Sequence, residues 1–505
     1  MLELFSLGIQ EVFRPYPLIL LFLGTAAGII VGCLPGFTIT MGVALVLPLT
    51  FGMTSIQGLT AMIGVLVGGL AGGQISGILL GIPGTPSSVA TVFDGHPMSK
   101  RGEPGTALAL GTWSSFLGGL ISAFVLMFFT PPLAEMALKF GPWEFFSLVL
   151  FGLTIIASLS GKSLNKGVIS GLIGLVAATF GVDPMIGIPR FSFGLHMMEG
   201  GFSFLPVLIG LFAFSQLMRN LEKSESTEAL VVSGNLHFSS PKVLKTIFKQ
   251  PFNLLRSSLI GVFIGALPGA GGSIANILSY DQAVKGSRHP EKFGTGIADG
   301  IIASEAANNA VGGGELTPTL ALGVPGSAVS AIMMGALILH GIQPGPLLII
   351  EFPDLVYGIF VAFFLAHFFM LALMLYGIQI FVRLTRIPVY VLIPSILVLC
   401  AVGSFAIHNR FFDIWVLLLF GGLGYMMVKY KFPLAPAILG VILGPLAEVN
   451  FRRALMTEDD LTLFITRPIS AAFLVLSVIS LFYPFYQQYR QKRREESERQ
   501  NRMRD

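Results

Sequence analysis

The sequence predicts an all-α protein that crosses a lipid bilayer many times. Of its 505 residues, 53% are hydrophobic and only 11% are charged, and the mean hydropathy is +0.80. Soluble domains carry about 25% charged residues, so a chain this poor in charge belongs in a membrane. A helix needs about 20 apolar residues to cross, and we therefore expect about 11–13 membrane segments, some of them hairpins or broken helices.

The apolar runs give the candidate segments in chain order. In the first half they are 17–34, 59–80, 107–129, 145–160, 167–182 and 204–218. In the second half they are 259–267, 314–339, 355–382, 389–407, 415–428, 434–446 and 469–485. Several of them end at a Pro-Gly pair and are too short to cross alone, which predicts broken helices there.

Two polar stretches divide the chain. Residues 219–256 hold six Lys or Arg and three Glu, and the tail from Arg490 to Asp505 holds seven Lys or Arg against four acids. By the positive-inside rule both are cytoplasmic, and the first of them includes a short amphipathic piece. We predict a first membrane repeat at 1–218, a cytoplasmic linker at 219–256, a second membrane repeat at 257–486 and a basic tail at 487–505.

An internal duplication is visible in four ordered matches. The pattern GxxxGxLPG occurs at 28–36 and 261–269, and LGIPG at 80–84 corresponds to LGVPG at 322–326. The same order continues with EPG at 103–105 and QPG at 343–345, then LFG at 150–152 and 419–421. The weakly acidic N-terminus suits the outside, so we expect the two repeats to be inverted.

Each repeat contains two Pro-Gly breaks, and each break is followed by a hydroxyl that can cap a new helix. A restarted helix offers free N–H groups and the positive end of its dipole, so four converging ends would hold a carboxylate without Lys or Arg. The alternative is that Pro-Gly only kinks packed helices. The predicted substrate-binding residues are Gly36, Thr38, Gly84, Thr85, Ser87, Gly269, Ser273, Gly326 and Ser327.

Polar side chains at 305, 308 and 309 predict a site for a coupling ion. One helix turn can present Glu305, Asn308 and Asn309 inward, and oxygen ligands of this kind suit Na⁺ while the carboxyl suits H⁺. Glycines 312–314 could unwind the helix and expose carbonyls. The alternative is hydrogen bonding between helices. Glu315 could instead face a loop or lipid.

Other polar residues receive weaker predictions. Gln74 and Ser76 occupy the places in the first repeat that Glu315 and Thr317 hold in the second, so they can line the cavity. Asp94 and Asp281, each preceded by an aromatic residue, are expected at the membrane surface.

Several classes of protein are excluded. Basic residues lie in short loops and the tail instead of on one folded face, which argues against nucleic acid as a partner. No nucleotide-binding, metalloprotease or nucleophile motif is complete, so we expect neither an enzyme nor a cofactor. Cys33 and Cys400 lie far apart within apolar segments and are expected to be buried thiols.

Longer motifs resemble the large membrane subunit of bacterial tripartite tricarboxylate transporters over nearly the whole chain. They are EAANNA at 305–310, LGVPGS at 322–327, HGIQPGP at 340–346, DGHPM at 94–98, GEP at 102–104, and LAP at 434–436 through RPIS at 467–470. One departure is Ser304, where the family pattern has a proline.

The resemblance implies a multi-pass permease of the bacterial cytoplasmic (inner) membrane. It implies a small membrane subunit and a periplasmic solute-binding protein as partners, and symport of carboxylates such as citrate with Na⁺ or H⁺. A carrier that needs no binding protein and a passive anion channel remain alternatives, as does a membrane scaffold or intramembrane enzyme.

Overall fold

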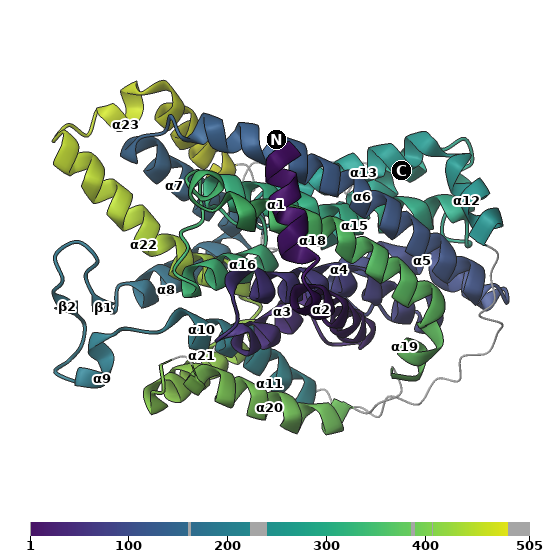
Figure 1. The fold of residues 1–505 in the computed structure, drawn as a ribbon, viewed down its shortest axis with the longest axis horizontal. Helices are drawn as coiled ribbons and strands as arrows, with labels where there is room; N and C mark the ends of the chain where they lie inside the picture. Colours follow the sequence, from purple (N-terminus) through teal and green to yellow (C-terminus); the bar gives the residue numbers. More distant parts are fainter. Residues whose placement is uncertain (1, 160–162, 223–239, 385–388, 407, 483–505) are drawn as a thin grey trace, which may run out of the picture. The chain divides into compact units, whose positions relative to one another are not determined.

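A computed structural model describes residues 2–159, 163–222, 240–384, 389–406 and 408–482 (Figure 1). Within this part, the strands are two residues each, β1 (Gly181–Val182) and β2 (Pro189–Arg190), paired antiparallel. Seven helices of the described residues are long and apolar enough to span a bilayer, and shorter apolar helices accompany them. The seven are α2 (Pro15–Cys33), α4 (Ser55–Leu80), α6 (Pro104–Ala137), the run Phe204–Glu222, α18 (Pro353–Tyr376), α21 (Phe411–Lys429) and α22 (Leu434–Thr457). The all-α polytopic prediction is confirmed.

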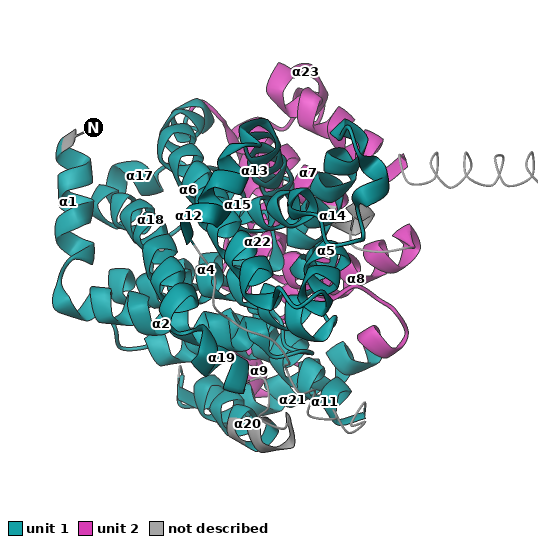
Figure 2. Cartoon of the chain, turned by 90° about the vertical axis from the view of Figure 1, so that its right-hand side faces the viewer, with its two compact units in different colours: residues 1–138, 203–426 teal, residues 139–202, 427–505 magenta. Residues whose placement is uncertain are grey.

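Packing divides the chain into two compact units (Figure 2). Unit 1 comprises Met1–Leu138 and Ser203–Met426, and unit 2 comprises Lys139–Phe202 and Met427–Asp505. This division follows contacts in space, so the boundaries of the two sequence repeats stay a prediction. The predicted amphipathic piece of the linker is α12 (Ser240–Phe248). The basic tail and residues 223–239 lie outside the described part.

Unit 1 is built on glycine-mediated packing of parallel helices. A Cβ on Gly24 or Gly28 of α2 would strike the carbonyl oxygen of Ala61 or Val65 of α4. The later glycine of α2 meets the later residue of α4, so the two helices run parallel. Only glycine allows backbones to approach this closely, and van der Waals contact at such interfaces replaces the hydrophobic effect inside a membrane.

The second repeat pairs its helices in the same way. A Cβ on Gly261 or Gly265 of α13 (Pro251–Ala266) would strike or crowd the carbonyl oxygen of Ala307 or Val311 of α15 (Ala298–Leu322). The two pairs then meet where α4 crosses α15. Leu70 of α4 contacts α15 at Asn308, whose side-chain amide donates a 2.8 Å hydrogen bond to the Leu70 carbonyl oxygen.

The crossing of α4 and α15 is antiparallel. A Cβ on Gly111 of α6 would touch the Gln74 amide and lie 3.4 Å from Glu305 Cγ, so the later residue of α4 lies near the earlier residue of α15. Antiparallel central helices are what an inverted duplication predicts. The duplication itself stays a prediction.

The four Pro-Gly pairs at 35–36, 83–84, 268–269 and 325–326 interrupt helices. After α2 the chain continues as α3 (Ile39–Val46) and η1 (Leu47–Thr50), and after α4 as η2 (Pro86–Ser88) and α5 (Val89–Lys100). After α13 comes α14 (Gly271–Gly286), and after α15 comes α16 (Ala328–Leu339). The predicted single segment at 314–339 is wrong: it joins parts of α15 and α16, which separate at Gly323 in the left-handed conformation (φ 68°). Hydropathy missed the start of α15 because polar residues fill its first turns.

The remaining elements complete the two units. Unit 2 contains α7 (Pro142–Leu159), α8 (Leu164–Ala178), α9 (His196–Glu199) and α23 (Leu463–Thr466). Unit 1 also contains α1 (Leu2–Val12), α10 (Phe204–Leu208), η3 (Ile209–Phe214), α11 (Ser215–Glu222), η4 (Pro290–Lys292), α17 (Leu348–Glu351), α19 (Ile378–Leu384) and α20 (Val389–Ala406).

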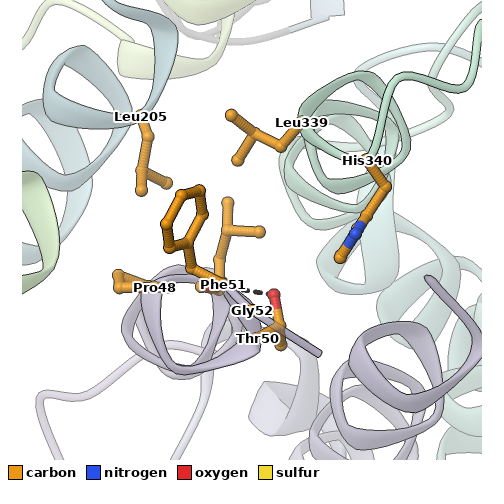
Figure 3. Close-up of a pocket in the computed structure, with 8 residues that line it drawn as sticks. Pro48, Thr50, Phe51, Gly52, Leu205, Leu339 and His340 are labelled. Atoms are coloured by element: carbon orange, nitrogen blue, oxygen red, sulfur yellow. Dashed lines mark hydrogen bonds between the residues drawn. The ribbon is translucent and has the colours of Figure 1, made fainter. Parts of the chain in front are cut away.

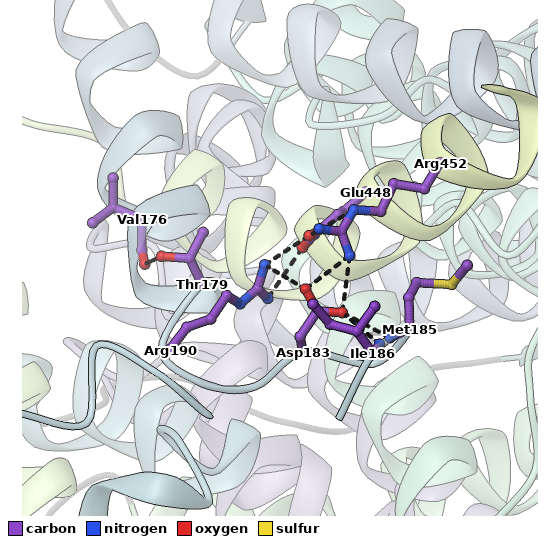
Figure 4. Close-up of polar contacts among 8 residues, drawn as sticks. All are labelled: Val176, Thr179, Asp183, Met185, Ile186, Arg190, Glu448 and Arg452. Carbon is purple, nitrogen blue, oxygen red and sulfur yellow. Dashed lines mark hydrogen bonds and ion pairs between the residues drawn. The ribbon is translucent and has the colours of Figure 1, made fainter. Parts of the chain in front are cut away.

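A network of four charges fixes the β1–β2 hairpin of unit 2 to α22 (Figure 4). Arg190 donates to both oxygens of Glu448 (2.6 and 3.2 Å), and Arg452 donates to both oxygens of Asp183 (2.9 and 2.7 Å). Asp183 also accepts the backbone N–H groups of Met185 and Ile186. Two acids and two bases cancel, so this network is a structural clamp.

Candidate functional site

The two breaks of each predicted repeat lie against each other. In the second repeat the Gly269 N–H donates to the Gly326 carbonyl oxygen (2.8 Å). A Cβ on Gly326 would strike the Gly265 carbonyl oxygen and lie 2.9 Å from Glu315 Cα. The break after Pro325 is therefore packed between the ends of α13 and α15.

The first repeat has the same arrangement. A Cβ on Gly84 would strike the Gly32 carbonyl oxygen and lie 3.0 Å from Gly73 Cα. These contacts pair Gly73, and not Gln74, with Glu315. The predicted correspondence of Gln74 with Glu315 is wrong by one residue, because the matched motifs at 80–84 and 322–326 differ by 242 positions and this offset already pairs residue 73 with residue 315.

The breaks of the two repeats also meet each other in unit 1. A Cβ on Gly272, in the first turn of α14, would lie 2.7 Å from Ser87 Cβ and 3.4 Å from Asn308 Oδ1. α14 packs on η2 and α5, while α3 packs on α16. These contacts bring Ser87, Gly272 and Asn308 together, whereas the Gly36 carbonyl oxygen lies at α11, where it accepts the side-chain N–H groups of Gln216 (2.7 Å) and Asn220 (3.2 Å).

The hydroxyls that follow the breaks mostly act as helix caps. Thr38 accepts the Met41 N–H (3.1 Å), and Ser327 accepts the N–H groups of Val329 and Ser330 (3.0 and 3.2 Å). Thr85 is the N-cap of η2 with a proline after it, as predicted. Its hydroxyl lies 3.1 Å from the Ser87 hydroxyl.

Ser273 does not cap its helix. α14 begins already at Gly271, with Ala270 as its N-cap and no side-chain cap, because Gly269 and Gly271 make the turn with positive φ (79° and 62°). The first N–H groups of α14 therefore receive no hydroxyl. This helix end differs from those of α3 and α16, whose N–H groups a side chain already accepts.

Glu305 is a fully buried carboxylate held by neutral donors. Its exposed fraction is 0%. Oε1 accepts the Thr91 hydroxyl of α5 (2.5 Å), and Oε2 accepts the Ser115 hydroxyl of α6 (2.8 Å). No Lys or Arg of the described residues forms an ion pair with it.

Three buried amides surround this carboxylate with unused hydrogen-bonding atoms. Asn308 donates to Leu70, but its Oδ1 has no partner, and neither Asn309 nor Gln74 has a partner for its oxygen or its nitrogen. All three side chains are 0% exposed. Buried polar atoms are nearly always hydrogen-bonded, so a group of five unpaired atoms calls for a ligand or bound water.

Two sequence predictions about this region are wrong. Glycines 312–314 do not unwind, because α15 is continuous and uses them for close packing against Phe363, Ser122 and Val262. Glu315 faces neither loop nor lipid, since it is 3% exposed. Asp94 is 0% exposed because a loop folds over it, and Asp281 is part-exposed and paired with Lys285 (2.6 Å), so their predicted place at the membrane surface stays a prediction.

Sequence reasoning missed three polar neighbours of Glu305. Thr91 and Ser115 bind its carboxylate, and Asn276 of α14 donates to the Ser304 carbonyl oxygen (3.0 Å) while accepting the Ala90 N–H (2.7 Å). All three are small polar residues far away in sequence, so no spacing rule points to them. Ser304 itself lies within α15, which begins at Ala298, so the missing proline does not affect the helix start.

The pocket in Figure 3 lies apart from these residues. It has a volume of about 80 Å³ and is lined by the η1 region, by Leu205 and by the end of α16. Phe51 and Leu205 face Leu339 and His340 across it (Figure 3). None of the predicted substrate-binding or ion-binding residues lines this pocket.

The chemistry of the site fits a hard cation better than a transition metal. Among the residues that the structure describes, no group of three His, Cys, Asp or Glu side chains could hold a metal. Glu305 and the free oxygens of Asn308, Asn309 and Gln74 instead supply one carboxylate and three amide carbonyls. Such oxygen ligands suit Na⁺, and the carboxylate alone suits a proton.

Comparison with known proteins gives one family and two relatives. Residues 18–439 match the family model described as the tripartite tricarboxylate transporter TctA family. An uncharacterized 52.8 kDa protein in the TAR-I ttuC′ 3′ region of Agrobacterium vitis is 34% identical over 474 residues, which cover 94% of each chain. An uncharacterized protein in the TAR-II ttuC′ 3′ region of the same organism is 36% identical over 220 residues, covering 43% of this chain and 91% of the relative. No solved structure matches the chain.

Proposed function

Because the chain belongs to the tripartite tricarboxylate transporter TctA family, we propose that it imports carboxylates such as citrate by symport with Na⁺ or H⁺. Membership makes it a subunit of a tricarboxylate transporter, which is a transport protein and not an enzyme. In the proposed system a periplasmic solute-binding protein delivers a di- or tricarboxylate. A small membrane subunit completes the permease in the bacterial cytoplasmic membrane.

The unpaired buried acid carries the proposal of cation coupling. A carboxylate without a cationic partner is costly inside a membrane and is expected to bind a proton or a cation. Glu305 accepts two neutral hydroxyl bonds, has the Asn308 amide within hydrogen-bonding reach, and has unpaired amide oxygens beside it. A coupling ion at Glu305, Asn308 and Asn309, with Gln74 as a further ligand, would satisfy these atoms together.

The substrate is proposed to bind beside the uncapped start of α14. There the N–H groups from Gly271 to Ser273 have no side-chain cap, and the Ser87 hydroxyl lies opposite. A helix N-terminus attracts a carboxylate through its N–H groups and its dipole.

Asn308 provides a route for coupling. It lies beside Gly272 and within hydrogen-bonding reach of Glu305, so one side chain borders both proposed sites. If the cation fixes the Asn308 amide in the orientation that the substrate requires, each ligand raises the affinity of the other, because such coupling is reciprocal.

Uptake of labelled citrate into proteoliposomes tests the proposal, with the small subunit and binding protein present. We expect accumulation that depends on a Na⁺ or proton gradient and falls at least tenfold in Glu305→Gln. Glu103→Gln, at an exposed residue, is the matched control and should transport normally. Uptake unchanged after both gradients are collapsed would support a passive anion channel, and uptake without the periplasmic protein would support an independent carrier. If Glu305→Gln and Asn309→Ala both retain full ion dependence, the site assignment is wrong.

A further inference from the structure

An apolar groove runs along the outer face of α13 and α14. It has a volume of about 450 Å³, and Arg256 is the charged residue in its lining. Its walls include Phe252, Leu259 and Phe263, whose side chains are 73%, 49% and 65% exposed. The groove lies wholly within unit 1.

The apolar residues of α13 form one stripe along the helix. Phe252, Leu255, Leu259 and Phe263 recur at intervals of three and four, which places them on one face. At 1.5 Å per residue this stripe is about 16 Å long, close to half the roughly 30 Å hydrocarbon core of a bilayer. Its length therefore matches one acyl chain of a single leaflet.

Arg256 lies beside the N-terminal part of this stripe, next to Leu255, and has no anionic partner among the described residues. One guanidinium nitrogen donates to Asn253 Oδ1 (3.0 Å), while Nε is buried and unpaired. No carboxylate of the described residues forms an ion pair with it; nearby Asp299 instead accepts from Gln250 (2.6 Å). A partly desolvated cation of this kind is stabilised by an anion.

Further positive charge lies on the same end of unit 1. α12 packs on α13 and carries Lys242 and Lys245, and Lys249 follows it. Basic residues next to a membrane helix attract anionic lipids by about 1 kcal/mol each. The exposed Phe252, at the start of α13, suits the level of the lipid headgroups.

We propose that this groove is a binding site for one anionic phospholipid. Its phosphate accepts hydrogen bonds from the Arg256 guanidinium, and an acyl chain lies along the stripe from Phe252 to Phe263. The other role for Arg256 is to face the C-terminal end of α14, since a Cβ on Gly286 would lie 2.7 Å from its Nη1. Only the lipid site uses both the groove and a guanidinium that hydrogen-bonds to Asn253 and stacks on Phe252 but has no anionic partner among the described residues.

Native mass spectrometry of the delipidated full-length chain tests this, with phosphatidylglycerol, phosphatidylethanolamine and inorganic phosphate as probes. Both lipids carry the phosphate that Arg256 would bind, but the ammonium of phosphatidylethanolamine cancels its net charge. An attraction of about 1 kcal/mol between one basic residue and an anionic lipid predicts about fivefold preference for phosphatidylglycerol. Arg256→Gln should reduce the preference, while Lys242, Lys245 and Lys249 retain part of it, and Arg288→Gln, an exposed cation on the same end, should leave it unchanged. Leu259→Trp, which fills the groove without changing charge, should weaken binding of phosphatidylglycerol.

Three results would overturn the proposal. Equal binding of both lipids, or an unchanged preference in Arg256→Gln, would mean that Arg256 does not bind the lipid and only faces the C-terminal end of α14. If inorganic phosphate bound as tightly as phosphatidylglycerol, the acyl chain would contribute nothing to affinity and the groove would not be part of the binding site. Lack of binding of either lipid would assign the groove to another occupant, such as a partner helix.

Discussion

Asp94 is predicted to be the most sensitive structural residue around the proposed ion site. It belongs to α5, and its Oδ1 accepts the N–H groups of Gly294 (2.9 Å), Gly296 (2.8 Å) and Ile297 (3.0 Å). Its Oδ2 accepts the Tyr280 hydroxyl (2.8 Å). Both glycines have positive φ (81° and 99°), which turns their N–H groups toward the carboxylate. The loop held in this way leads directly into α15.

The size of the effect follows from the number of bonds lost. Asp94→Ala leaves three N–H groups and one hydroxyl without an acceptor, and breaking a buried charged network typically costs about 3–5 kcal/mol. Asp94→Asn keeps one acceptor oxygen but loses the charge, so we expect about 1–2 kcal/mol. Tyr280→Phe removes a single donor and should cost about 1 kcal/mol.

Thermal unfolding of the purified protein in detergent, with limited proteolysis of residues 287–297, measures this order. We expect Asp94→Ala to lower the melting temperature most and to expose the loop to protease, with Asp94→Asn intermediate and Tyr280→Phe least affected. If Asp94→Ala were no more destabilising than Tyr280→Phe, the carboxylate would not be what fixes this loop.

Two further predictions concern helix packing and the charged clamp of unit 2. Gly265→Ala places a Cβ 2.5 Å from the Val311 carbonyl oxygen and should lower the free energy of unfolding by about 1–3 kcal/mol, measured by thermal unfolding. Gly422→Ala, where the added Cβ meets open space, is the control and should leave it unchanged. Equal effects of the two substitutions would refute close packing at Gly265. Burial raises the pKa of Asp183, but the Met185 and Ile186 N–H groups and Arg452 outweigh it and hold that pKa below its usual value. Because the pKa of Asp183 is lower in the folded protein, its ionised carboxylate contributes stability that is fully present above the unfolded pKa near 4. This stability is lost as the pH falls through the folded pKa. Hydrogen exchange of residues 181–190, corrected for its intrinsic rate, should thus be constant from pH 7 to 5 and rise only below about 4; loosening at pH 6 would contradict this.

The breaks could be predicted from sequence because their cause is local. Proline lacks an N–H and glycine tolerates the turn, so α2, α4, α13 and α15 all end within three residues of a Pro-Gly pair. The caps at Thr38, Thr85 and Ser327 were equally local and are confirmed. The assignment at Ser273 failed because the glycines before it let the helix start early.

The surroundings of Glu305 could not be predicted because they depend on packing between distant segments. Thr91 and Ser115 are 214 and 190 residues away in sequence, and both are ordinary helix residues by type. The start of α15 was hidden for a related reason. Its polar residues lower the hydropathy, although tertiary packing buries every one of them from Gly300 to Ala321.

The two repeats differ in charge at equivalent breaks, and this bears on where an anion can bind. Beside Gly326 lies Glu315, which is 3% exposed; beside Gly84 the residue in the corresponding place is Gly73, which has no side chain. A second carboxylate would be repelled at the former break unless Glu315 is protonated or a cation is bound, and it meets no such charge at the latter. The electrostatics therefore favour a substrate between Thr85, Ser87 and the start of α14 over one at Ser327. If the proposed ion coupling holds, we expect Glu315 to be a second acid at which a bound proton or Na⁺ permits an anion to approach the break at Gly326.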